Sequence, residues 1–414
     1  MSYLRRKVIN LAAFTIIDTV LNRFVKLFAV FILINFIPIE NIGILGLAGS
    51  YLVFIQLILV APENILLRKS KDELEDRKHS NSLISIFINF NLLRNVCIFL
   101  ISLIVGYALF QANILLFITF VALVLNLLLE STQELIKLIF YVNFQQKKVT
   151  KINLLNNSIF LFSYIFLFFF PSLVTYAIIL IITQIIAIFV WILVLKSSLS
   201  FHYKYKKGWT KNIINNLKEF SFWQHMNTSV MNFIYQIDPF ILSFYVSLSL
   251  IGIYTIALKI SNFFFLIPML LQKSTTVHIS NKTDRIAVKN VLKKYIGIYG
   301  LISIGQLLFF IIFGKLIIHH LFSQDNIDPI YRLTLIILTG ISILNIFRPL
   351  ISITVSKMKL RSTFFYVYLP SFVLSVILYL LLGYIYGMYG VAYANIINFS
   401  VFSILLFYFY KNHY

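Results

Sequence analysis

Apolar stretches of roughly 20 residues, the length of a membrane-spanning helix, recur along the whole chain between short polar segments. The pattern predicts an all-α integral membrane protein rather than a mixed fold, because no period-two alternation interrupts these stretches. Twelve transmembrane helices are expected, at residues 10–36, 43–66, 82–110, 113–141, 152–170, 173–195, 221–246, 250–272, 295–320, 330–354, 364–384 and 389–410.

Composition supports this interpretation. The chain is 60% hydrophobic and 12% charged, whereas soluble proteins are roughly 25% charged, so too little polar sequence is present to cover a soluble core. The first apolar run, 10–36, is too long for a signal peptide and lacks a small-residue cleavage site, so it is expected to remain as a span. The single cysteine, Cys97, lies in an apolar run and is expected to be a small core residue.

The formal net charge of +21 comes from basic clusters that occupy every second connection between spans. By the positive-inside rule, this alternation predicts that the N and C termini are both cytoplasmic. Because the membrane topology accounts for the positive charge, nucleic-acid binding is not needed to explain it. The clusters are Arg5–Lys7, Arg68–Lys78, Lys147–Lys151, Lys204–Lys218, Lys282–Lys294 and Lys357–Arg361.

The longest connection divides the spans six and six. We therefore predict an N-terminal six-helix bundle at 1–195, a basic cytoplasmic linker at 196–219 and a C-terminal six-helix bundle at 220–414. Ile42-Gly43-Ile44 with Ala48 aligns with Ile251-Gly252-Ile253 with Ala257 at a constant offset of 209. Six spans in each half give parallel repeats, an arrangement found in transporters with a midplane site.

Five cations lie inside predicted spans: Arg23, Lys26, Arg94, Lys259 and Arg348. A charge at the bilayer centre costs at least about 3 kcal/mol. Five charges of one sign therefore predict a shared polar interior that binds an anion. The alternatives are that these cations form ion pairs or extend to the membrane interface. Arg348 is expected at the edge of the polar interior, because it is close to the cytoplasmic end of its span.

Three acidic residues also fall in these spans. Asp18 and Asp238 are expected to be counter-charges for the cations. Pro239 follows Asp238 and predicts a kink. Glu130 belongs to a polar face near a cytoplasmic helix end, where snorkelling is an equal alternative. Helical spacing places on that face Asn126, Glu130, Gln133, Glu134 and Lys137.

Several functions are disfavoured by what the sequence lacks. No G-x-x-x-x-G-K-[ST] phosphate loop is present. The connections between spans are too short to hold a folded catalytic domain. The asymmetric distribution of charges and the division of the chain into two halves favour an alternating-access transporter over a channel.

A family resemblance follows from the two aligned motifs. Pro38 to Ile44, continuing to Ala48 and Ser50, resembles the "gPE-x-[FY]-G" signature of polysaccharide-unit flippases, which belong to the multidrug/oligosaccharidyl-lipid/polysaccharide exporter superfamily. Ile237-Asp238 and the stretch from Ile251 to Lys259 resemble the second-half signature of these flippases. Ile44 and Leu45 depart from the pattern, in which an aromatic residue is frequent near Gly43.

The resemblance implies a flippase for undecaprenyl-pyrophosphate-linked oligosaccharide repeat units of O-antigen or capsule, in the bacterial cytoplasmic (inner) membrane. The substrate would move by alternating access from the cytoplasmic to the outer leaflet, beside membrane lipid and with a polysaccharide polymerase as a partner. No cofactor is implied, although H⁺ or Na⁺ coupling is an option. The residues implied for binding are Arg23, Lys26, Arg94, Lys259 and Arg348, and those implied for coupling are Asp18, Glu130 and Asp238.

Three other functions stay open. A lipid II flippase is the nearest alternative. A multidrug antiporter of the same superfamily would need an acidic cavity for cationic drugs, whereas the predicted interior is basic. A lipid-linked sugar polymerase would need a substantial outer loop, which the predicted topology does not provide.

Overall fold

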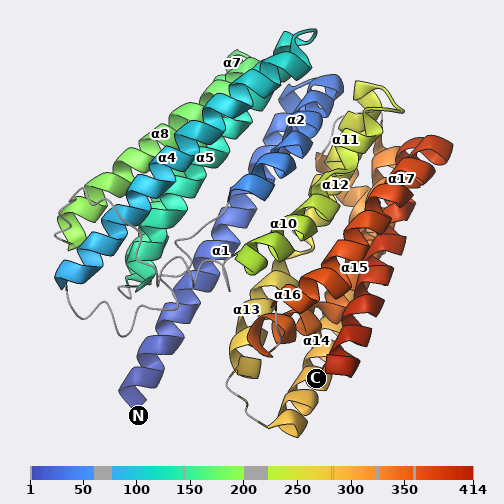
Figure 1. The fold of residues 1–414 in the computed structure, drawn as a ribbon. Helices are drawn as coiled ribbons and strands as arrows, with labels where there is room; N and C mark the ends of the chain where they lie inside the picture. Colours follow the sequence, from blue (N-terminus) through green and yellow to red (C-terminus); the bar gives the residue numbers. More distant parts are fainter. Residues whose placement is uncertain are drawn as a thin grey trace. The chain divides into compact units, whose positions relative to one another are not determined.

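The computed structural model describes residues 2–59, 77–142, 145–199, 222–280, 282, 284–321, 326–357 and 360–413, and within this part the chain is all-helical (Figure 1). The expected all-α class is confirmed for these residues. The elements are α1 (Ser2–Phe36), α2 (Ile39–Ile58), α4 (Arg77–Phe110), α5 (Ile114–Val142), α6 (Gln146–Ser163), α7 (Ile165–Phe169), α8 (Leu173–Leu199), α10 (Phe222–Gln236), α11 (Asp238–Leu242), α12 (Leu248–Phe263), α13 (Leu266–Ser280), α14 (Arg285–Leu321), α15 (Ile327–Lys357), α16 (Leu360–Thr363), a π-helical turn η3 (Phe364–Tyr368) and α17 (Leu369–His413).

Eight helices in the described ranges are long and apolar enough to cross a membrane, and nine if the bent pair α12 and α13 forms one span. The last of the eight, Leu360–His413, contains two predicted spans. Gly387 interrupts it with φ 56° and ψ −134°, a conformation that glycine adopts readily because it has no Cβ. The predicted loop near this residue therefore coincides with a backbone break. The number twelve and the repeat stay predictions.

Contacts divide the chain into two compact units, which are described separately. Unit 1 comprises residues 1–29 and 54–225, and unit 2 comprises residues 30–53 and 226–414. The helices α1 and α2 each contribute residues to both units. Most of the predicted linker 196–219 lies outside the described residues. The predicted domain boundaries stay predictions.

In unit 1, α5 packs against α4 and α8, and α6 packs against α8. Cys97 of α4 is exposed, so the expectation that it is a core residue is wrong. The core of this unit is aromatic and aliphatic. Phe140 and Trp191 are fully buried with ring centroids 5.6 Å apart, and Val149 of α6 joins the same cluster. Burying a side chain of this size contributes roughly 1.5–3 kcal/mol. The core side of α5 is therefore firmly packed.

In unit 2, α15 is the central helix and contacts α12, α13, α14 and α17. Buried apolar side chains occur along its full length, among them Leu333, Leu338, Leu344 and Ile353. A helix that is buried on most of its circumference must satisfy any polar side chain within the protein. This requirement bears directly on Arg348, which belongs to α15.

The two glycines of the aligned motifs bring α2 and α12 into close backbone contact within unit 2. A Cβ atom on Gly43 would lie 2.0 Å from the carbonyl oxygen of Leu248, and one on Gly252 would lie 2.1 Å from that of Ile39. Small residues allow such approach between membrane helices. The glycines are thus required by packing, and the contact is reciprocal.

We predict that Gly252→Ala destabilises the protein by about 1–3 kcal/mol, because the added methyl group would force α2 and α12 apart. Gly300→Ala is the matched control, since nothing lies within 4 Å of the place that its Cβ would take and alanine favours a helix. Unfolding of the purified variants in detergent measures both. Equal stability of the two variants would contradict the close contact.

Candidate functional site

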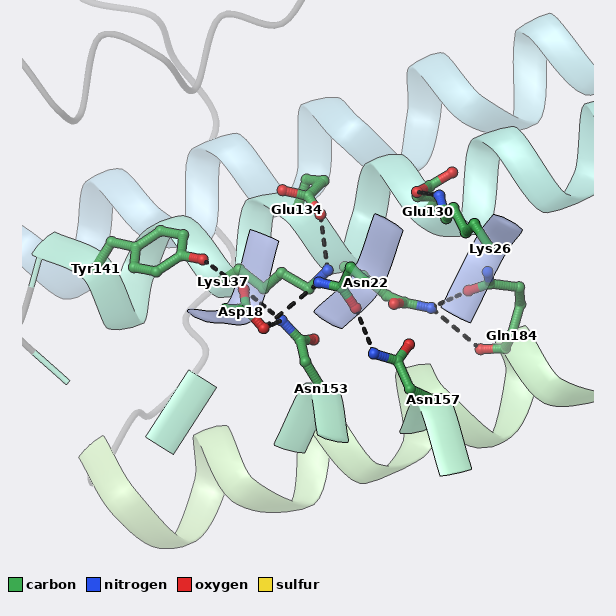
Figure 2. A network of polar contacts seen from close by, with 11 residues as sticks. Asp18, Asn22, Lys26, Glu130, Glu134, Lys137, Tyr141, Asn153, Asn157 and Gln184 are labelled. Atoms are coloured by element: carbon green, nitrogen blue, oxygen red, sulfur yellow. Dashed lines mark hydrogen bonds and ion pairs between the residues drawn. The ribbon is translucent and has the colours of Figure 1, made fainter. Parts of the chain in front are cut away.

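A polar network in unit 1 centres on Asp18 of α1, which is 6% exposed (Figure 2). The amide of Asn153 in α6 donates to both carboxylate oxygens, at 2.8 and 3.0 Å. The hydroxyl of Tyr141 lies 3.5 Å from the carboxylate, and the amide of Asn22 donates to it at 3.4 Å. Neutral donors from three helices therefore hold this carboxylate.

Helical spacing explains why these side chains meet. Asp18 and Asn22 are four residues apart on α1, and Asn153 and Asn157 are four residues apart on α6, so each pair lies on one helix face. The amide of Asn157 donates to the side-chain oxygen of Asn22 at 2.6 Å, one turn beyond the Asp18 contact. The two pairs form a ladder of polar contacts between α1 and α6.

The cation of the same helix, Lys26, forms an ion pair with Glu130 of α5 at 2.9 Å. Their side chains are 65% and 35% exposed, and pairs of this kind contribute roughly 0–1 kcal/mol in water. One predicted cation is thus neutralised by a predicted acidic residue. Two further contacts involve residues of the predicted polar face of α5. Lys137 forms an ion pair with Glu134 at 2.7 Å, and the amide of Gln133 donates a hydrogen bond to the side chain of Gln184 in α8.

Arg94 of α4 is half-buried in a second polar cluster of unit 1. Its Nε and Nη2 each donate to the side-chain oxygen of Asn95 at 3.2 Å, and Nη2 also donates to the hydroxyl of Ser131 at 3.3 Å. The guanidinium carbon lies 5.8 Å from the centre of the Phe90 ring. The contacts of Asn95 with Ser131 and the Leu128 carbonyl tie α4 to α5 and fix the position of this cation.

In unit 2, Asp238 is fully buried at the junction of α10 and α11, where Pro239 follows it as predicted for a kink. Its Oδ2 accepts hydrogen bonds from the Tyr254 hydroxyl at 2.5 Å and from the Asn395 amide at 2.8 Å. The Tyr379 hydroxyl donates to Asn395 at 2.6 Å. The other oxygen, Oδ1, has no hydrogen-bond partner among the described residues. This carboxylate is also held by neutral donors.

The remaining predicted cations have different surroundings. Arg348 is 5% exposed inside unit 2, with its guanidinium carbon 5.1 Å from the centre of the Phe265 ring. Lys259 lies on α12 with an exposed side chain. The side chain of Arg23 lies outside the described part of α1. The structure thus brings together Lys26 and Glu130, and the substrate and coupling roles of all eight predicted residues stay predictions.

The expected counter-charge role of Asp18 and Asp238 is not seen within the described side chains, where neither carboxylate forms an ion pair within 4 Å. Their actual partners include neutral residues that were not among the predicted site residues. A signal was present, because amides spaced four apart in an apolar helix require a partner inside the protein. The partners of Asp18 include Asn153 and Tyr141, and those of Asp238 include Tyr254 and Asn395. Asn157 and Tyr379 extend the two networks through Asn22 and Asn395.

The described side chains contain no group of three or more His, Cys, Asp or Glu residues that could hold a metal ion.

Comparison with solved structures identifies the fold. The lipid II flippase MurJ, in an inward closed conformation, aligns with a TM-score of 0.72 and 17% identity over 97% of this chain and 87% of that chain. A transporter of the MOP superfamily from Pyrococcus furiosus aligns with a TM-score of 0.66 and 11% identity, over 98% and 95% of the two chains. A MATE transporter of Vibrio cholerae aligns with a TM-score of 0.64 and 12% identity, over 99% of this chain and 97% of that chain. The fold is therefore shared with transporters of this superfamily.

A family model for polysaccharide biosynthesis proteins matches residues 36–330, well over half of the chain, so the chain belongs to that family. The probable flippase AglR of Haloferax volcanii is 27% identical over 172 residues, which are 41% of this chain and 36% of that relative. The match thus spans only about a third of that relative's length. The resemblance stated from the sequence is confirmed at the level of family and fold.

We predict that Asn153→Ala destabilises the protein by about 2–3 kcal/mol, because it removes two hydrogen bonds from a buried carboxylate. Ser158→Ala on the same helix is the control and should change stability by less than about 0.5 kcal/mol. Unfolding in detergent measures both variants. When Asp18→Asn is already present, Asn153→Ala should reduce the free energy of unfolding by less than it does in the wild type. An equal reduction in both would show that the two side chains do not interact.

Proposed function

We propose that this protein is a flippase for lipid-linked oligosaccharide, a transporter rather than an enzyme. Its substrate would be an undecaprenyl-pyrophosphate-linked repeat unit of O-antigen or capsule, moved from the cytoplasmic to the outer leaflet of the bacterial cytoplasmic membrane. The observation that carries the proposal is an excess of intramembrane cations in a member of the polysaccharide biosynthesis family. A polysaccharide polymerase would be the partner that receives the exported unit.

The chemistry of the substrate fits such cations. The many hydroxyl groups of a glycan prevent it from crossing hydrocarbon unaided, and its pyrophosphate requires positive charge on the way. Arg94 supports the proposal because its contacts with Asn95 and Ser131 hold the guanidinium in a fixed position. Arg23 and Lys259 complete the proposed set, and Lys26 would join it when its ion pair with Glu130 opens. Arg348 is left out of this set because its side chain is almost wholly buried inside unit 2.

Energy for the movement is available from the membrane potential, since exporting one negative charge toward a positive outside is favoured by about 2.3 kcal/mol per 100 mV. Ion coupling would add to this. Each unit holds one buried carboxylate with neutral donors, Asp18 in unit 1 and Asp238 in unit 2. A carboxylate without a paired cation can take up H⁺ or Na⁺, and we propose both as coupling residues. Glu130 fits this role less well, because Lys26 already occupies it.

A lipid II flippase is the second candidate, and the fold similarity with MurJ supports it. Its substrate is also a pyrophosphate-linked isoprenoid, so the intramembrane cations suit either molecule. A multidrug antiporter is less well supported, because cationic drugs would meet repulsion from the same residues. Reconstituted vesicles loaded with either fluorescent lipid-linked oligosaccharide or lipid II would separate the first two candidates.

We expect Arg94→Ala and Lys259→Ala each to reduce surface polysaccharide at least tenfold, because each removes a charge that binds pyrophosphate, worth about 1.5–3 kcal/mol. Arg23→Ala is expected to behave in the same way. Labelled glycan on intact cells measures the effect, and membrane fractions report the amount of protein. Arg332→Ala, an exposed cation of α15, is the control. Full surface polymer in all three variants would contradict the proposal.

We expect Asp18→Asn and Asp238→Asn to abolish the response of transport to an imposed H⁺ or Na⁺ gradient, because an amide cannot bind either ion as a carboxylate does. Transport driven by membrane potential alone should persist in these variants. Proteoliposomes with imposed gradients provide the measurement. Asp328→Asn is the control, because that carboxylate is exposed and pairs with Lys315 at 2.8 Å. An intact gradient response in both variants would exclude coupling at these residues.

A further inference from the structure

Arg348 combines almost complete burial with unused hydrogen-bond donors. Its side chain is 5% exposed, and its Nε and Nη1 are buried without a partner among the described residues. Within that same part of the chain it forms no ion pair. Asn345, one turn earlier on α15, also has an unpaired side-chain oxygen, so the two side chains do not satisfy each other. A buried charge with unused donors requires a compensating group.

The aromatic contact does not supply enough compensation. The Phe265 ring centre is 5.1 Å from the guanidinium carbon, and a cation–π contact attracts the cation without neutralising its charge. Removing a charge from water is unfavourable unless a group of opposite charge or further hydrogen bonds compensate for it. Part of the cost of burying Arg348 is therefore still unmet by the described residues.

Three departures from regular helix gather around this residue. The α12–α13 pair bends by 43° at the turn that contains Phe265. Pro349 follows Arg348 and removes one backbone donor from α15. The π-helical turn η3 ends with Tyr368, which is close enough to Arg348 to interact electrostatically. Irregular backbone at membrane depth occurs where it is buried in protein or lines a cavity, and π-turns are frequent at functional sites.

The hydroxyl of Tyr235 adds a further donor. It is buried and close enough to the guanidinium to accept a hydrogen bond from it, and no other hydrogen-bond partner for it lies within the described ranges. The Tyr235 ring packs on Phe265 with centroids 5.1 Å apart, which fixes the direction of the hydroxyl. Two guanidinium nitrogens and one phenol therefore provide donors in one place, and donors of these kinds bind anions.

We propose that Arg348 and Tyr235 form a binding site for a small monovalent inorganic anion, chloride being the probe, inside unit 2. The single negative charge of such an anion would balance the single positive charge of the guanidinium. The aromatic side chains close to Arg348 leave little access, because Tyr299 is fully buried and Tyr368 is 5% exposed. The proposal goes beyond the proposed flippase function and does not depend on it.

The test is thermal unfolding of the purified protein at constant ionic strength and pH, with gluconate replaced stepwise by chloride. Wild type and Arg332→Gln, an exposed cation of the same helix, should show a saturable rise in the unfolding midpoint. Arg348→Gln should lose the chloride response. Tyr235→Phe should raise the half-saturating chloride concentration roughly tenfold, because it removes one hydrogen bond to a charged group.

Three outcomes would overturn the proposal. The first is a wild-type midpoint that is the same in chloride and in gluconate, a measurement that needs no variant to fold. The second is an equal chloride response in wild type and Arg348→Gln. The third is stabilisation by inorganic phosphate that exceeds that by chloride, which would indicate a phosphate or lipid-headgroup site. Bromide soaked into crystals should give anomalous density beside Arg348, and density elsewhere only would count against the site.

Discussion

The absence of hydrogen-bond partners in hydrocarbon is the constraint on which the rest of this structure depends. A polar side chain in a membrane span must find its partner in the protein, because leaving a buried polar group unpaired costs several kcal/mol. Asp18 meets this requirement through Asn153, which joins α1 to α6. Asp238 meets it at one of its two oxygens, through Tyr254 and Asn395, which join α11 to α12 and α17. Polar contacts thus select which helix faces pack together.

Close backbone contact also determines how helices pack in unit 2. Gly43 and Gly252 allow α2 and α12 to approach until each backbone lies against the carbonyl of the other helix. The bend between α12 and α13 and the proline of α15 give unit 2 a less regular interior. Regular helices can bury apolar surface without further help, so the irregular positions are the ones that need a special explanation. They coincide with the buried cation Arg348.

The sequence was sufficient to predict the helical class, the helix interruption beside Asp238 and the break near Gly387, because hydrophobic length, proline and glycine act locally. It also placed Glu130 and Gln133 on one face of α5. It did not identify their partners, since helical spacing defines a face but not the helix opposite. The contact between Asp18 and Asn153 joins residues 135 positions apart. Arg348 was expected at the edge of the polar interior, whereas side chains from other helices cover it.

The nature of each partner, rather than burial alone, decides what a buried charge can do. Lys26 and Glu130 neutralise each other, so an ion that binds Glu130 must first displace an ammonium group. Amides and phenols hold Asp18 and Asp238, and among the described side chains neither carboxylate has a cation within ion-pair distance, although Lys137 lies close enough to act electrostatically on Asp18. The same reasoning applies to Arg348 with the sign reversed, because an aromatic ring attracts the cation but cannot neutralise it. Exchangeable ions are therefore expected at the residues held by neutral groups.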